Sequence, residues 1–80
     1  MITVYILYSN SISKYYIGQT QDFEDRMIRH NSSRSLSTKN GIPWKLIWKT
    51  EVQSRSNAVL LESKIKGRGA KRFLSDIGLA

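Results

Sequence analysis

Three segments of the chain have the residue pattern of β-strands. Residues 3–8 (TVYILY) and 14–19 (KYYIGQ) are rich in β-branched and aromatic residues, and the turn-forming SNSIS at 9–13 separates them. We therefore expect these two segments to form a hairpin. In residues 44–51 (WKLIWKTE), tryptophan and leucine alternate with lysine, which predicts a third strand with one buried face.

The stretch that follows the second strand predicts a helix over residues 22–31. Asp22 is suited to cap its N-terminus, and Phe23 and Met27 recur at helical spacing on one face. The next stretch, residues 32–43, is polar and rich in serine, so we expect a loop there.

A second, longer helix follows the third strand. Ser54 or Ser56 would cap it, and it should run to about Lys66, where Gly67 and Gly69 break it before a short terminal helix, AKRFLSDI. The predicted order is therefore β-β-α-β-α-α. Since no long crossover joins the first two strands, the sheet should be mainly antiparallel, and the fold class is α+β in a single domain spanning residues 1–80.

Composition narrows the function. The chain has no cysteine and one histidine, which argues against a disulfide scaffold, a thiolate metal site or a multi-histidine zinc cluster. We find no signal peptide and no membrane-spanning segment, and expect a cytoplasmic protein. Thirteen Lys and Arg against six Asp and Glu give a net charge of +7. Such an excess favours nucleic acid as the partner over anionic lipid, although charge for solubility alone is the competing explanation.

Two residues of the first predicted helix stand out. At about 100° per residue, Arg26 and His30 lie beside Phe23, on the rim of the apolar stripe rather than on the solvent side. A hydrogen-bonded rim histidine and a surface ion pair would explain them without function. A phosphate-binding site would explain them together.

Glu62 is the second anomaly, because it lies beside the apolar stripe of the later helix. A carboxylate at that edge is either solvated or held near a cation. Tyr5 and Tyr16 lie on the two strands of the predicted hairpin, where they could be cross-strand neighbours. Tyrosine pairs are usually packing, so each signal is weak alone.

Taken together, these residues resemble the GIY-YIG nuclease superfamily, and the resemblance covers nearly the whole chain, in the manner of small stand-alone bacterial members. The second half of the family motif is intact as YIG at residues 16–18, and TVY at residues 3–5 keeps the tyrosine of the first half. About ten residues separate the two elements, as the family's hairpin requires. The family's helical arginine and histidine fall on Arg26 and His30, and its metal-binding glutamate falls on Glu62.

The resemblance implies metal-dependent hydrolysis of phosphodiester bonds in DNA. Glu62 would hold one Mg²⁺ or Mn²⁺ ion, and Arg26 would bind a phosphate oxygen. Tyr5 would act as the general base for the attacking water, and Tyr16 would orient the water or the phosphate. His30 would relay the phenolic proton or bind the phosphate.

Basic residues elsewhere are candidate contacts for the nucleic-acid backbone, with little sequence specificity expected. They are Lys14, Lys39, Lys45, Lys64, Lys66, Arg68, Lys71 and Arg72. The competing hypotheses are a non-catalytic DNA- or RNA-binding module with a vestigial nuclease site, and a ribosome-associated RNA-binding protein. A protein partner or a homodimer is compatible with the sequence.

Overall fold

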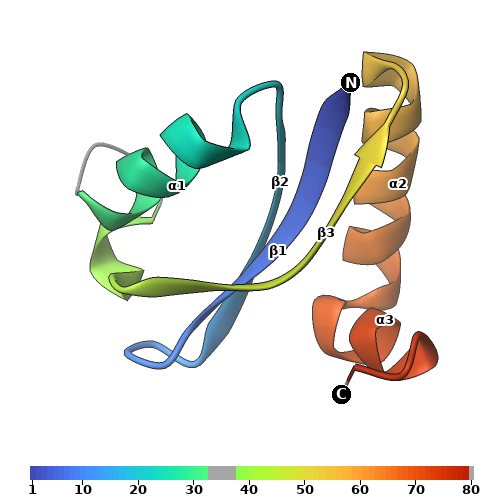
Figure 1. Ribbon diagram of the computed structural model, residues 1–80. Coiled ribbons are helices and arrows are strands. Elements are labelled where there is room, and N and C mark those ends of the chain that lie inside the picture. Colours follow the sequence, from blue (N-terminus) through green and yellow to red (C-terminus); the bar gives the residue numbers. More distant parts are fainter. Residues whose placement is uncertain (33–37, 80) are drawn as a thin grey trace.

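The computed structural model describes residues 1–32 and 38–79. Within them, a three-stranded sheet is combined with three α-helices and one short 3₁₀ helix, in the predicted β-β-α-β-α-α order (Figure 1). The elements are β1 (Ile2–Ser9), β2 (Lys14–Thr20), α1 (Phe23–Asn31), η1 (Lys39–Gly41), β3 (Trp44–Val52), α2 (Arg55–Arg68) and α3 (Ala70–Asp76). The predicted α+β class is confirmed.

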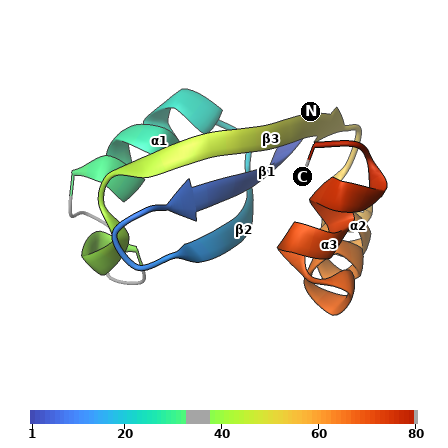
Figure 2. The same cartoon turned by 90° about the horizontal axis from the view of Figure 1, so that it is seen from below.

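The sheet has the order β2-β1-β3, and both pairings are antiparallel. The hairpin of β1 and β2 is therefore confirmed, and β1 is the central strand. Helix α1 lies on one side of the sheet, while α2 and α3 lie together on the other (Figures 1 and 2). Because β1 is covered on both sides, its residues are apolar or aromatic on both faces, apart from Thr3 and Ser9.

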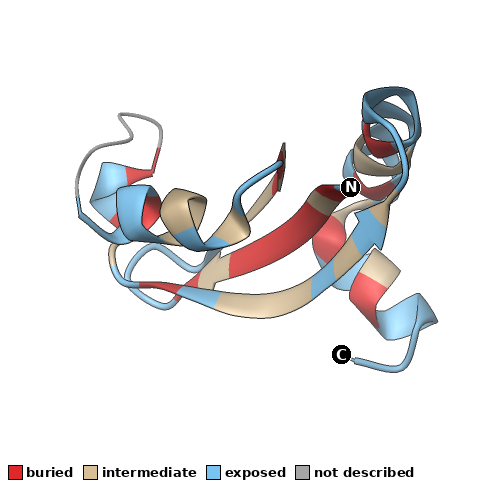
Figure 3. Cartoon of the chain, turned by 45° about the horizontal axis from the view of Figure 1, so that its top comes forward, coloured by how far each residue is buried: buried red, intermediate tan, exposed pale blue. Residues whose placement is uncertain are grey.

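Two apolar clusters fill the two sides of the sheet. On the α2/α3 side, Ile2, Val4 and Ile6 pack with Ala58 and Ile65. The α1 side is built on Tyr5, Leu7 and Trp44, and the partly buried Phe23 and Met27 of α1 pack against them. Figure 3 shows that the buried residues concentrate along β1. The alternation of β1 therefore decides which side chains face α1.

Strand β3 corrects one prediction. Ile6 pairs with Trp48 but the next residue, Leu7, pairs with Leu46, so the pairing shifts at this point. The shift leaves Ile47 as an extra residue, as in a β-bulge. Trp44 and Leu46 consequently pack on the α1 side, whereas Trp48 packs on the α2/α3 side. The prediction of one buried face for this strand was wrong, because a single inserted residue exchanges the faces.

The helix caps follow the sequence closely. Asp22 accepts a hydrogen bond from the Asp25 backbone N–H, as predicted for the start of α1. Of the two serines considered for α2, Ser54 is the cap. Helix α2 continues to Arg68, so Gly67 does not break it. The helix ends at Gly69, whose φ of 92° is a conformation that favours glycine.

The predicted loop of residues 32–43 contains a feature that the sequence pattern did not show. Residues 39–41 form η1, and Thr38, just before it, is buried. Residues 33–37 lie outside the described residues. No helix in the described part of the chain is long and apolar enough to cross a membrane.

Candidate active site

Tyr5 is the centre of the site. It lies on the central strand, is fully buried, and its hydroxyl is 2.9 Å from Nε2 of His30. Gly18 is its direct partner on β2. A Cβ atom added to Gly18 would lie 2.6 Å from the Tyr5 hydroxyl oxygen, so only glycine leaves room for that hydroxyl. The glycine is needed here for space and not for an unusual backbone conformation.

His30 connects Tyr5 to the 3₁₀ turn. It occupies the last turn of α1, is buried, and places Nδ1 2.9 Å from the Thr38 hydroxyl oxygen. The Thr38 carbonyl oxygen in turn accepts a hydrogen bond from the Trp44 indole N–H at 2.6 Å. The sequence placed His30 on a rim, but the structure places it inside, where Tyr5, Tyr16 and Thr38 contact it.

The protonation states of this pair follow from burial. Burial, and then the charge of Arg26, lower the pKa of His30, so the imidazole is neutral at pH 7 and carries one N–H. Burial, with the neighbouring Tyr16 as a second cause, raises the pKa of Tyr5, so its phenol keeps its proton. The arrangement that satisfies all groups has the Tyr5 O–H donating to Nε2 and Nδ1–H donating to Thr38.

The end of α1 is fastened to β3 by Asn31. Its side-chain amide donates to the Trp44 carbonyl oxygen at 3.1 Å, and its Oδ1 accepts from the Trp44 backbone N–H at 2.6 Å. This two-way contact fixes the last turn of the helix, and therefore His30, against the sheet.

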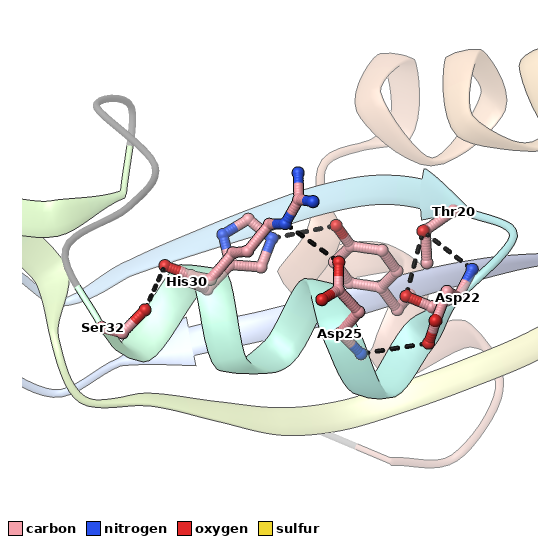
Figure 4. A network of polar contacts seen from close by, with 7 residues as sticks. Thr20, Asp22, Asp25, His30 and Ser32 are labelled. Carbon is pink, nitrogen blue, oxygen red and sulfur yellow. Dashed lines mark hydrogen bonds and ion pairs between the residues drawn. The ribbon is translucent and has the colours of Figure 1, made fainter.

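The start of α1 is fixed at its corner with β2. Thr20 uses its hydroxyl to accept from the Asp22 N–H at 3.1 Å and to donate to the Asp22 carbonyl oxygen at 3.2 Å. Figure 4 shows this corner, with Asp25 and His30 further along the same helix. Contacts at both ends of α1 therefore orient Arg26 relative to the sheet in the folded state.

Tyr16 and Arg26 lie beside the Tyr5–His30 pair. Tyr16 stands opposite Leu7, so it is the diagonal cross-strand neighbour of Tyr5, and the centroids of the two rings are 6.4 Å apart. Its partly exposed ring packs on His30, with the centroids 4.9 Å apart. Within residues 1–32 and 38–79, Arg26 makes no ion pair, so the surface ion pair considered for it is not observed. Its guanidinium is available for an anion.

Glu62 reaches the site from the other side of the sheet. Its carboxylate accepts from Gln19 Nε2 at 3.1 Å and from Lys66 Nζ at 2.6 Å, and its side chain is 19% exposed. Arg26 and Glu62 are both close enough to Tyr5 for their charges to act on its pKa, in opposite directions. Arg26 on α1 and Glu62 on α2 lie on opposite sides of the sheet, and both lie near the edge strand β2.

A divalent cation fits this position. No cluster of three or more His, Cys, Asp or Glu residues occurs in the described ranges, so an ion here would rest on Glu62. Mg²⁺ is commonly held by one or two carboxylates together with waters and substrate phosphates. The Lys66 ammonium now pairs with this carboxylate, so a metal ion would replace Lys66 as its positive partner.

An open hollow of about 260 Å³ adjoins the site at the end of β2. It lies between α1 and the start of α2, and its lining is mostly polar. The lining residues are Gln19, Thr20, Gln21, Asp22, Asp25, Arg26, Arg29 and Arg55.

The eight cations predicted to contact nucleic acid are all exposed and belong to five elements. Two of them are engaged within the chain. Lys66 pairs with Glu62, and Arg68 pairs with Asp76 through contacts of 2.8 and 3.0 Å. Their role in binding stays a prediction.

Four polar residues of the site were not anticipated from the sequence: Gln19, Asn31, Thr38 and Arg55. Gln19 gave the clearest available signal, because it follows the YIG triplet on a strand. The contacts of the others depend on chain segments that only the tertiary fold brings together.

Comparison with known proteins gives one match. A model of the GIY-YIG catalytic domain matches residues 1–73. No curated protein and no solved structure matches the chain. Proteins of the matching kind are nucleases, and the match covers every residue of the site described above.

Proposed function

Because the chain belongs to the GIY-YIG catalytic-domain family, we propose that it is a metal-dependent endonuclease that hydrolyses phosphodiester bonds in DNA. The observation that carries this proposal is the hydrogen bond between the Tyr5 hydroxyl and the neutral imidazole of His30. A buried phenol and a buried, neutral histidine in contact form a path for a proton. Arg26 and Glu62 supply the charges that phosphate chemistry needs on either side of that path.

Tyr5 acts as the general base through His30. Since its pKa is raised, Tyr5 is protonated at neutral pH and accepts a proton from water only if its own proton leaves. His30 takes that proton on Nε2 while Nδ1–H donates to Thr38, so the imidazolium that forms is stabilised by a fixed acceptor. The water oxygen then attacks phosphorus, and the 3′-oxygen leaves.

The phosphate is held by Arg26 and oriented by Tyr16. Arg26 donates to a non-bridging oxygen, where negative charge develops, and Tyr16 presents the more exposed phenol to the water or the phosphate. Glu62 would hold one Mg²⁺ or Mn²⁺, whose charge, when bound, stabilises the leaving 3′-oxygen. Gln19 keeps the Glu62 carboxylate turned to the edge of β2. The surface cations bind the backbone with little dependence on sequence, and a cytoplasmic location fits the cysteine-free chain.

The test is cleavage of supercoiled plasmid, branched DNA and single strands with Mg²⁺, Mn²⁺ or EDTA. We expect products that require the metal, and none with EDTA. Glu62→Ala should abolish them while leaving DNA affinity equal or higher, because the substitution removes a negative charge from a phosphate site. If no substrate gives a metal-dependent product, the protein is instead a non-catalytic nucleic-acid-binding module.

A further inference from the structure

The hollow beside the active site has a charge pattern that the mechanism above does not use. Three arginines and two aspartates line it. Asp25 and Arg29 neutralise each other in an ion pair of 2.9 Å, while the Asp22 carboxylate, which caps α1, keeps its negative charge. Arg26 and Arg55 have no carboxylate partner among residues 1–32 and 38–79. Three arginines against two aspartates leave the hollow with a net positive charge, and two of its guanidinium groups can bind an anion.

Arg55 is held in place by a chain of polar contacts that ends at Glu62. It donates to the Gln19 Oε1 at 3.1 Å, and the Nε2 of the same amide donates to Glu62 at 3.1 Å. An amide suits this position, since it accepts from a guanidinium on one side and donates to a carboxylate on the other. Arg55 is thus tied in position to the residue expected to hold the metal.

Arg26 connects the hollow to the reaction centre. It lines the hollow, and its charge also acts on Tyr5 and His30. Arg55 lines the same hollow, so a nucleic-acid strand whose reacting phosphate contacts Arg26 has a second arginine beside it for a neighbouring phosphate.

We propose that Arg55 binds the backbone phosphate adjacent to the reacting one, in the hollow between α1 and α2, so that the strand is held on two consecutive phosphates. The inference rests on the proposed function, since it assumes a nucleic-acid strand over Tyr5. Two consecutive contacts fix the line along which the strand runs as well as its position, which a single contact at Arg26 does not.

The first test measures DNA binding in EDTA, where cleavage plays no part. Arg55→Gln should weaken binding about fivefold at 0.15 M salt and reduce the slope of log K against log salt by about 0.7 to 0.9, the effect of losing one phosphate contact. Lys49→Gln is the control, because it removes the same charge from β3, the opposite edge strand, where Lys49 stacks on Phe23. The proposal is wrong if Arg55→Gln leaves the slope unchanged, or if Lys49→Gln reduces it equally.

The second test locates the phosphate. Binding is measured on a branched oligonucleotide, whose branch fixes the register, with one phosphate at a time replaced by an uncharged methylphosphonate. The affinity of Arg26→Gln should no longer fall when one particular phosphate is replaced, and that of Arg55→Gln should no longer fall when the neighbouring phosphate is replaced. The proposal is overturned if both variants lose their response at the same phosphate, if the two phosphates are far apart, or if neither variant loses a response. Because the parent's cleavage is assayed separately, the proposed nuclease activity can fail while this result still decides on the subsite.

Discussion

Gly18 offers the sharpest test of the geometry around Tyr5. In Gly18→Ala, the new methyl group would lie 2.6 Å from the Tyr5 hydroxyl oxygen and 2.8 Å from Cζ, distances that require the ring to move. Overpacking of this kind typically costs about 1–3 kcal/mol. For a domain of this size, about 1 kcal/mol shifts Tm by about 4–8 °C, so we expect Tm to fall by roughly 5–20 °C.

Gly67→Ala is the matched control. Nothing lies within 4 Å of a Cβ added at Gly67, and the residue is in the last turns of α2. Alanine is favoured over glycine in a helix by about 0.5–1 kcal/mol, so this variant should melt slightly above the parent. The two substitutions add the same methyl group and should change Tm in opposite directions.

A double-mutant cycle with Tyr5→Phe identifies the clashing group. Alone, Tyr5→Phe leaves the buried Nε2 of His30 without its partner, which costs about 1–3 kcal/mol. In the Gly18→Ala background that hydrogen bond is already displaced. The double mutant should therefore lose less stability than the sum of the two single losses, by about 0.5–3 kcal/mol. Urea unfolding of the four proteins measures this. A Gly18→Ala variant that melts with the parent, or strictly additive costs, would refute the packing described for Tyr5.

Three further predictions concern the same neighbourhood. The free energy of unfolding should decrease as pH falls below about 6.5, because the histidine is protonated at a higher pH in the unfolded chain than in the folded one, where His30 is buried. Urea titrations between pH 5 and 8 should show this loss of stability, and His30→Gln should remove it. Tyr5→Phe should lower the single-turnover cleavage rate by about 10²–10⁴-fold, whereas Tyr15→Phe should leave the rate nearly unchanged. Equal, near-parental rates for both variants would assign the role of general base to Tyr16 instead. Asn31→Ala should cost about 1–3 kcal/mol by thermal melt, because two backbone groups of β3 lose their partner; an unchanged Tm would mean that Asn31 does not fasten the helix.

Local signals in the sequence were sufficient for most of the fold. The Asp22 cap, the turn between the first two strands and the apolar stripe of α2 each depend on neighbours within a few residues. The bulge in β3 was missed because it depends on how Leu46 and Trp48 pair with β1, which alternation alone does not reveal. Gly67 was misassigned because a glycine tolerated near a helix end looks the same in sequence as one that ends it.

Some residues of the candidate site were predicted and others were missed, again because contacts between distant parts of the chain leave no local signal in the sequence. The resemblance to a known family singled out Tyr5, Arg26 and His30, which the fold brings together around one hydrogen bond. Gln19 and Arg55 escaped notice because their contacts join residues 36 apart in the sequence. Neither belongs to the motif quoted for the family, and polar side chains on exposed ends of elements are common. Only the packing of α2 against the edge of β2 gives them partners.

The position of Tyr5 on the central strand has a consequence for amide hydrogen exchange. Strand β1 is hydrogen-bonded on both edges and covered on both faces, so its amides should exchange only when the whole chain unfolds. Helix α1 rests on the sheet through one face and exposes Ile28 and Arg29, so its amides should exchange through smaller openings. The hydroxyl group of the proposed base therefore belongs to the slowest-exchanging strand, while Arg26 belongs to an element that can open while the sheet stays intact.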